Sequence, residues 1–229
     1  MAKQQNKAKK PTAKPATRPA AAAPAAPRQN RLNTSTVVCG RKGCGKSTLL
    51  RGMANEYVTA NARAYLGQGK RVLICDTNGA PAYKDLPLLS SAQLAAWKPN
   101  GNLKIARYCD PDKKKMVNDV ATHFKQGLVI FEDALGYINP AAIPQNVRAF
   151  LVDHRMADLD LIFTFHAVMT IPPFFWLFQT YLILLKTNEN REKIARTTKI
   201  ADTENLLKEF DRIAASQNPY ISTVIETGL

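Results

Sequence analysis

Short apolar runs alternate with amphipathic stretches along most of this 229-residue chain. Continuous apolar runs are typical of strands that are buried on both faces, as in parallel sheets. Strands are expected at residues 35–39, 71–76, 103–108, 128–131, 160–165, 180–185 and 220–226, and helices at 46–62, 91–97, 112–124, 145–159 and 202–216. Alternating strands and helices of this kind predict an α/β fold, with a mostly parallel sheet covered by helices on both faces.

Residues 161–185 contain no Lys, Arg, Asp or Glu, and a segment of this length could span a bilayer. The segment also contains His166, Gln179 and the pair Pro172-Pro173, which are unusual in a membrane helix. We favour two core strands joined by an apolar, aromatic turn, with a membrane span as the alternative.

The first 31 residues differ in composition from the rest of the chain. They hold eight Lys or Arg, no acidic residue, and 15 Ala or Pro without apolar periodicity. Such a segment cannot bury enough apolar surface to offset the entropy of ordering, so we predict a disordered basic arm over residues 1–33. The arm either contacts nucleic acid or an acidic surface, or serves only solubility. It lacks the apolar region of a secretory signal peptide, whereas a transit peptide is conceivable.

A glycine-rich motif follows the first predicted strand and opens the first predicted helix. It reads Gly40-Arg41-Lys42-Gly43-Cys44-Gly45-Lys46-Ser47 and fits the pattern G-x-x-x-x-G-K-[ST]. Glycines in such a loop turn backbone N–H groups toward an anion, and the helix N-terminus adds its dipole. The sequence therefore predicts a nucleotide-binding loop from Gly40 to Thr48. Lys46 would reach the β- and γ-phosphates, and the Ser47 hydroxyl would be a ligand of Mg²⁺.

Two adjacent acids end the apolar strand expected at 128–131. Hydrolysis of a bound nucleotide needs a metal ligand and a group that aligns the attacking water. The run 128–133, LVIFED, resembles a Walker B strand of the additional-strand catalytic-glutamate type. We assign Glu132 to Mg²⁺ and Asp133 to the water, although the usual order in that class is Asp then Glu. The alternative is a pair of acids in a strand-end turn.

His166 is a polar residue at the tip of the otherwise apolar strand 160–165. In the additional-strand class this strand lies between the Walker B strand and the strand that precedes the loop. Its carboxyl end would then lie beside the γ-phosphate. His166 is accordingly a candidate sensor that hydrogen-bonds phosphate or water, and a histidine that only caps the strand is the alternative.

Four segments together resemble the FtsK–HerA superfamily of P-loop pumps, above all viral genome-packaging ATPases and Zot-like phage proteins. They are GRKGCGKSTLLRGM, RVLICDTNGAPAY, LVIFEDA and VDHRMADLDLIFTFH, and the resemblance covers residues 34–187. Its more distinctive features are the acid at the end of the second strand, Asp76, and the polar residue that ends the sensor strand. The family usually carries Gln at the sensor position, so His166 is a departure.

The resemblance implies a P-loop ATPase domain over residues 34–229. It implies a homo-oligomeric ring, commonly a hexamer, that uses ATP and Mg²⁺ to move DNA or a DNA-linked substrate. A packaging ATPase would also meet a capsid or portal protein and act in the host cytoplasm or the virion. A neighbouring subunit would supply an arginine finger. Arg155 is the candidate, and a solvated helix arginine is the alternative.

Three other functions remain open from the sequence. A Zot-like, membrane-associated assembly factor would bring residues 171–177 or 161–185 to a bilayer. A small-molecule kinase would use a lid of basic residues after the last core strand, from Lys186, Arg191, Lys193, Arg196 and Lys199. Adjacent acids at the Walker B end suit water activation better than phosphoryl transfer to a metabolite. A nucleotide-dependent scaffold would need none of these hydrolytic groups.

Overall fold

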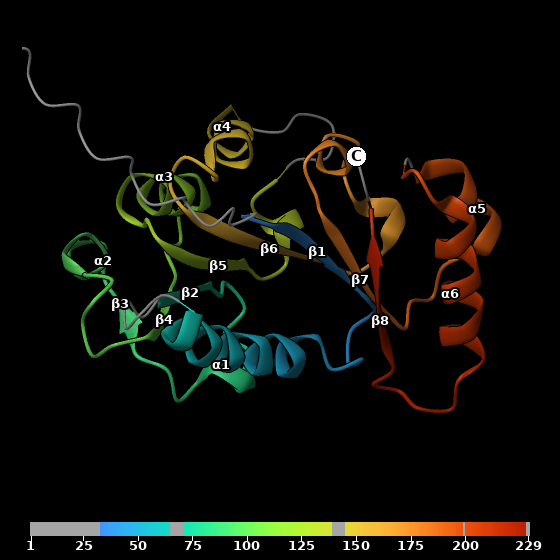
Figure 1. Ribbon diagram of the computed structural model, residues 1–229, viewed down its shortest axis with the longest axis horizontal. Helices are drawn as coiled ribbons and strands as arrows, with labels where there is room; N and C mark the ends of the chain where they lie inside the picture. The colour runs from blue at the N-terminus through green and yellow to red at the C-terminus, as the bar shows by residue number, and fades with distance from the viewer. Residues whose placement is uncertain (1–32, 65–70, 139–144, 199, 228–229) are drawn as a thin grey trace, which may run out of the picture. The chain divides into compact units, whose positions relative to one another are not determined.

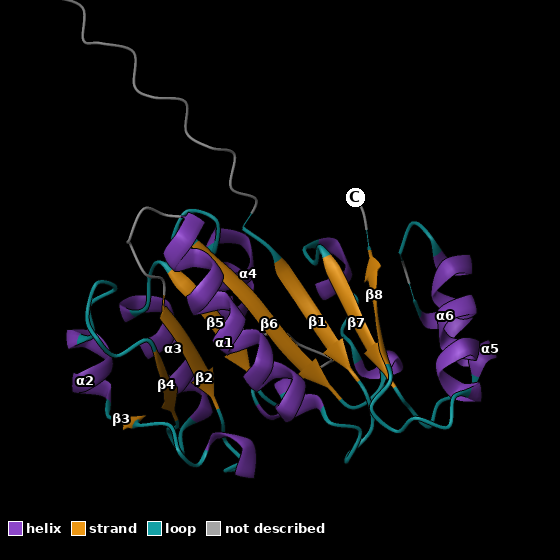
Figure 2. Ribbon diagram, turned by 60° about the horizontal axis from the view of Figure 1, so that its bottom comes forward, coloured by secondary structure: helices purple, strands orange, loops and turns teal. Residues whose placement is uncertain are grey.

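The apolar runs form the strands of one sheet, in the order β3-β4-β2-β5-β6-β1-β7-β8 (Figures 1 and 2). The computed structural model describes residues 33–64, 71–138, 145–198 and 200–227, so the predicted arm lies outside them except for Asn33. Neighbouring strands are parallel, except that β8 is antiparallel to β7. The strands are β1 (Ser35–Cys39), β2 (Arg71–Cys75), β3 (Leu88–Leu89), β4 (Ile105–Tyr108), β5 (Gly127–Phe131), β6 (Leu159–Phe165), β7 (Tyr181–Leu185) and β8 (Ser222–Glu226).

Helices cover both faces of this sheet, which confirms the predicted fold class. Helix α1 lies on one face, where its buried Leu50 and Ala54 pack with Val38 of β1. The buried residues of the other helices join the core on the opposite face, together with Val37 of β1. In the described residues the helices are α1 (Lys46–Ala64), α2 (Ser91–Ala96), α3 (Lys113–His123), α4 (Gln145–Asp153), α5 (Arg191–Thr197) and α6 (Thr203–Ala215).

Coverage of both faces explains why the strands read as continuous apolar runs. Successive strand residues point to opposite faces, so a strand between two layers of helices needs apolar side chains at every position. All the residues of β1, β2, β5 and β6 are buried. Strand β6 lies between β5 and β1, as the additional-strand arrangement predicts.

Helix α4 is shorter than the sequence predicted. It ends at Asp153 instead of 159, and the N–H groups of Met156 and Ala157 bond the Asp153 carbonyl. Asp158 then takes a left-handed φ of 56°, which turns the chain into β6. The turn is required because Leu159 must pair with Gly127 in register with β5.

Two short elements were not predicted, and the last strand starts later than expected. Strand β3 has two residues and helix α5 has seven, in which Ile194 is the buried residue. Neither is long enough to show a repeating apolar pattern. The last strand begins at Ser222 instead of 220, and its exposed edge position explains its weak pattern.

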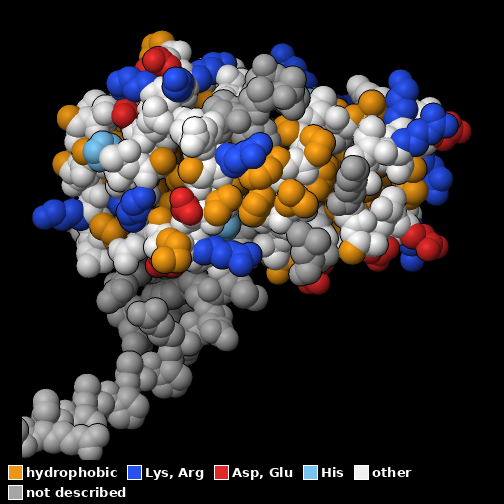
Figure 3. Space-filling view, turned by 90° about the horizontal axis from the view of Figure 1, so that it is seen from above, with side chains coloured by type: hydrophobic (Ala, Val, Ile, Leu, Met, Phe, Trp, Pro, Cys, Tyr) orange, Lys and Arg blue, Asp and Glu red, His pale blue; other side chains and the backbone are white. Residues whose placement is uncertain are grey.

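The uncharged segment 161–185 is not one continuous helix. It contains most of β6, two 3₁₀ turns (Val168–Thr170 and Phe175–Leu177) and β7. Figure 3 shows neighbouring hydrophobic side chains on the face that is seen from above. Met169 and Leu177 of this segment are 40% and 57% exposed. Among the described residues, no helix has the length and apolar character to cross a bilayer.

Candidate nucleotide-binding site

The glycine-rich loop joins β1 to α1 at the carboxyl ends of the parallel strands. Gly43 and Gly45 take φ values of 80° and 87°, which residues with a side chain rarely adopt. A Cβ atom on Gly40 would lie 2.7 Å from the Cys44 Sγ, so the loop closes tightly on itself. These conformations bring the loop to the first turn of α1, where backbone N–H groups are free to bind an anion.

Lys46 is folded back over the loop. Only 8% of it is exposed, and its Nζ donates to the carbonyl oxygens of Gly40 at 2.5 Å and Arg41 at 3.1 Å. The same Nζ lies 3.3 Å from Nδ1 of His166, at the end of β6. The tertiary structure therefore brings the loop lysine and the predicted sensor into direct contact, across 120 residues of sequence.

Glu132 follows β5 and is 7% exposed. Its carboxylate accepts hydrogen bonds from the Tyr83 hydroxyl at 2.5 Å and the Thr164 hydroxyl at 3.2 Å. The Ser47 side chain also lies near the Tyr83 hydroxyl. Burial and the nearby Glu132 charge raise the pKa of Tyr83, so the phenol stays protonated and donates. The Tyr83 hydroxyl thus lies beside both predicted Mg²⁺ ligands, Ser47 and Glu132.

Asp133, the second acid, is more exposed than Glu132. Its backbone is left-handed, with φ 52° and ψ 65°, and its N–H donates to the Thr164 hydroxyl at 2.7 Å. Its side chain is 31% exposed and lies 3.9 Å from Nε2 of His166. Asn78 also donates to this carboxylate, at 3.2 Å. A left-handed aspartate costs energy, and here the bond from its N–H to Thr164 helps to hold that conformation.

Asp76, the acid that follows β2, anchors the loop that carries Asn78 and Tyr83. Its carboxylate is almost fully buried and accepts from the N–H groups of Asn78 at 3.2 Å and Ala80 at 2.9 Å. Arg107 of β4 lies 4.0 Å from the same carboxylate and balances its charge. Asp76 therefore places two side chains that touch the acids after β5.

These groups surround one cavity of about 860 Å³. The predicted residues that line it are Lys42, Gly43, Gly45, Lys46, Ser47, Thr48, Glu132, Asp133 and His166. Two other loop residues turn elsewhere: Arg41 donates to Asn188 at 3.0 Å, and Cys44 is buried. The sequence analysis missed Asn78, Thr164, Tyr83 and Tyr220 as parts of this region. Only Thr164 gave a signal, as a hydroxyl in an otherwise apolar buried strand.

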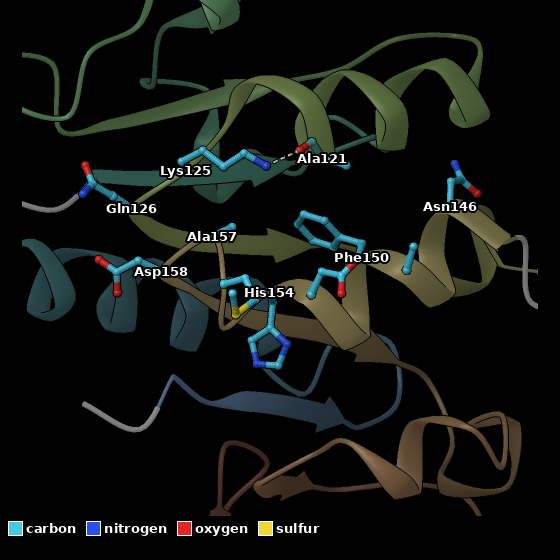
Figure 4. A pocket seen from close by; sticks show the side chains of 11 residues that line it. Ala121, Lys125, Gln126, Asn146, Phe150, His154, Ala157 and Asp158 are labelled. Atoms are coloured by element: carbon cyan, nitrogen blue, oxygen red, sulfur yellow. Dashed lines mark hydrogen bonds between the residues drawn. The ribbon is translucent and has the colours of Figure 1, made fainter. Parts of the chain in front are cut away.

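Arg155 lies far from the cavity, at the other end of the sheet. It belongs to the turn between α4 and β6, at the amino ends of the strands, and its carbonyl accepts from Asn33 at 3.1 Å. A separate hollow of about 630 Å³ lies beside this turn (Figure 4) and is lined by Lys125, Phe150 and His154. Ligands of open α/β sheets bind at the carboxyl ends, so this hollow is not the nucleotide site. Arg155 could reach a phosphate only in another subunit.

The donor set fits a magnesium ion. No cluster of three or more His, Cys, Asp or Glu side chains suited to a metal occurs in the described part of the chain. Magnesium needs no such cluster, because it keeps several waters and takes one or two protein oxygens together with substrate phosphates. The Ser47 hydroxyl and the Glu132 carboxylate, which line the same cavity, would provide those two oxygens.

Comparison with solved structures finds a similar fold in viral genome-packaging proteins and in VirB4. The genome packaging NTPase B204 from Sulfolobus turreted icosahedral virus 2, in complex with ATP-gammaS, superposes with a TM-score of 0.64 at 16% identity. The match covers 85% of this chain and 93% of that chain. B204, the DNA-packaging ATPase from Sulfolobus turreted icosahedral virus, gives 0.62 at 18% identity over 85% and 93%. VirB4 of Thermoanaerobacter pseudethanolicus gives 0.51 at 12% identity over 84% and 88%.

The neighbours confirm the α/β fold that the resemblance implied. A scan against models of known protein families found no match. A search of curated protein sequences also found none. At these identities the likeness is one of fold, so the chemistry has to be argued from the cavity itself.

Proposed function

We propose that this protein is an ATP-hydrolysing motor that moves nucleic acid, and that its task is viral genome packaging. One observation carries the proposal: a single cavity holds the loop lysine, the two acids after β5 and the polar tip of β6. These are the groups that phosphate binding, metal binding and water activation require. The fold shared with the DNA-packaging ATPase B204 supports the biological task.

The loop and Lys46 would bind the phosphates of ATP. N–H groups at the start of α1 and the Lys46 ammonium lie on the same wall of the cavity. The ammonium now bonds two loop carbonyls, so its charge is already held close to the place where the β- and γ-phosphates would lie. It would stabilise the charge that develops on the phosphoryl oxygens during hydrolysis.

The metal ligands and the water-orienting acid would come from the other residues of the cavity. A bound Mg²⁺ would neutralise phosphate charge, and Ser47 and Glu132 would hold it. Asp133 would orient the attacking water and accept its proton on a carboxylate oxygen. Asn78 and His166, which flank this carboxylate, would keep it directed at the water. His166 would also hydrogen-bond the γ-phosphate, because its Nδ1 lies beside Lys46.

The proposed assembly is a homo-oligomeric ring, commonly a hexamer in similar proteins, with DNA as the polymer. Arg155 is exposed at the end of the sheet opposite the cavity. It would therefore act as an arginine finger only in the cavity of a neighbouring subunit. The basic arm would contact the nucleic acid, and a capsid or portal protein would anchor the ring.

The kinase alternative loses support in the region after β7. Three of the basic residues considered for a lid lie in α5, which packs on α6 through the buried Ile194. Arg191 pairs with Asp211 of α6 at 3.0 Å. A lid has to open and close over a substrate, and a helix that is packed and paired in this way is part of the fold.

ATP turnover measured with and without double-stranded and single-stranded DNA tests the proposal. We expect Mg²⁺-dependent hydrolysis that DNA stimulates, and sedimentation should show a ring that forms or tightens with ATP. Turnover that no nucleic acid changes, in a protein that stays monomeric with ATP, would contradict a translocating motor. Hydrolysis that requires a small-molecule acceptor would favour the kinase.

A further inference from the structure

A second hollow adjoins the phosphate cavity, between α1 and the end of β7. Its volume is about 500 Å³, and Leu49 and Met53 of α1 and Leu185 of β7 form its apolar walls. It shares Gly45, Thr48 and Tyr220 with the phosphate cavity, so the two hollows meet at the start of α1. A ligand with phosphates in the first hollow could extend directly into the second.

Tyr220 stands where the two hollows meet. A Cβ atom on Gly45 would lie 2.9 Å from Cδ1 of the Tyr220 ring, so the ring lies directly against the loop backbone. The residue is nevertheless 67% exposed. The Tyr220 N–H donates to the Asn218 side chain at 2.9 Å, which fixes the turn that presents the ring. An exposed aromatic face beside apolar walls suits a flat aromatic ligand.

Gly52 leaves the hollow open on the side of α1. A Cβ atom there would meet nothing within 4 Å, so packing does not require a glycine at this position. Glycine within a helix costs about 1 kcal/mol relative to alanine. Among the described residues that line the hollow, Glu56 is the only charged one, and its carboxylate can accept hydrogen bonds from an amino group.

We infer that this hollow binds the base of the nucleotide and that the Tyr220 ring is its stacking surface. The inference rests on the proposed function, since it places the base relative to phosphates held by residues 40–48. A nucleotide joins a charged chain of phosphates to an aromatic base through one sugar. The two hollows offer surfaces in the same order. The free N–H groups and Lys46 would meet the phosphates, the shared residue Thr48 lies at the level of the sugar, and the apolar walls with the Tyr220 ring would meet the base.

Binding of ATP and of inorganic tripolyphosphate, measured by titration calorimetry in the presence of Mg²⁺, tests the inference. Tyr220→Ala removes the ring and Gly52→Leu fills the hollow. Each should weaken ATP binding by about tenfold or more, as loss of one base-stacking contact does, and leave tripolyphosphate binding unchanged. Tyr220→Phe should bind ATP like the wild type, because it keeps the ring. Val224→Ala, on the exposed side of β8, is the matched control and should change neither ligand.

Unchanged ATP affinity in both Tyr220→Ala and Gly52→Leu would overturn the inference. Equal losses for ATP and tripolyphosphate would overturn it as well, because Tyr220 would then only support the loop. A wild-type protein that binds tripolyphosphate as tightly as ATP would refute the base site and leave the proposed function standing. If the wild type binds neither ligand, the proposed function fails, and the base site fails with it.

Discussion

The phosphate side and the acidic side of the cavity reach their geometry in different ways. The phosphate side is one continuous segment, and its shape follows from its own glycines and from the helix that begins at Lys46. The acidic side is assembled from residues that follow β2 and β5 and from β6, and each holds the next through hydrogen bonds. The shape of the loop proposed to bind phosphate is therefore a local property of the chain, whereas the positions of the acids depend on the order of the strands.

Lys46→Ala gives the largest expected effect and tests the phosphate side alone. Loss of the ammonium removes the charge nearest the phosphates, so ATP turnover should fall by about 100-fold or more. Circular dichroism should show that the fold survives, because the loop's own glycines set its shape. Lys84→Ala, an exposed lysine outside the cavity, is the control and should keep normal turnover. Unchanged turnover in a folded Lys46→Ala protein would contradict the assignment.

Exchanging each acid for its amide tests whether the two acids have separate tasks. Asp133→Asn should still bind ATP and trap it, with turnover lowered by about 100-fold, because an amide cannot accept the proton of the water. Glu132→Gln should instead weaken the Mg²⁺ requirement or nucleotide binding, since it removes the buried charge. Binding of a fluorescent ATP analogue measures the loss of nucleotide affinity, and single-turnover hydrolysis measures the loss of chemistry, so together they distinguish the two variants. The opposite pattern would show that the roles of Glu132 and Asp133 are exchanged.

Thr164→Val tests the link that holds the acidic side together. The change keeps the shape of the side chain and removes the hydroxyl that bonds both the Asp133 N–H and the Glu132 carboxylate. We expect a loss of about 1–3 kcal/mol in the free energy of unfolding, because buried polar groups lose a partner. Turnover should fall by more than ATP binding. Urea denaturation measures the first effect, with Thr59→Val on the exposed side of α1 as the control. Turnover equal to the wild type would mean that Thr164 does not position the acids.

Deletion of residues 1–31 gives the smallest expected effect on either side of the cavity. The segment has eight cations and no apolar pattern, so thermal unfolding and basal ATP turnover should stay nearly unchanged. DNA affinity should become less sensitive to salt, because contacts between the arm and phosphates would no longer release counterions. Equal slopes of log affinity against log salt in both proteins would show that the arm does not bind DNA.

The contrast between the two sides also explains which parts of the site could be predicted. The glycine motif, the strand before it and the helix after it are adjacent in the chain, so pattern alone indicated their geometry. Glu132 and Asp133 could be named as acids at the end of a strand. Nothing in the sequence indicated that the backbone at Asp133 is left-handed, or that Thr164 bonds both acids. Tyr83 and Asn78 lie in a loop without a pattern, and their contacts with the acids depend on the position of β2 beside β5.

The sequence by itself determined the α/β class, the phosphate loop and the strand that ends in two acids. These features depend on side-chain type and spacing over short stretches, where local propensity and periodicity act. Only the tertiary structure decided that His166 meets Lys46, that Tyr83 donates to Glu132, and that Tyr220 lies against Gly45. The physical reason is that each of these contacts joins residues distant in sequence. Their positions are set by strand order and by packing against a common core, which no local pattern records.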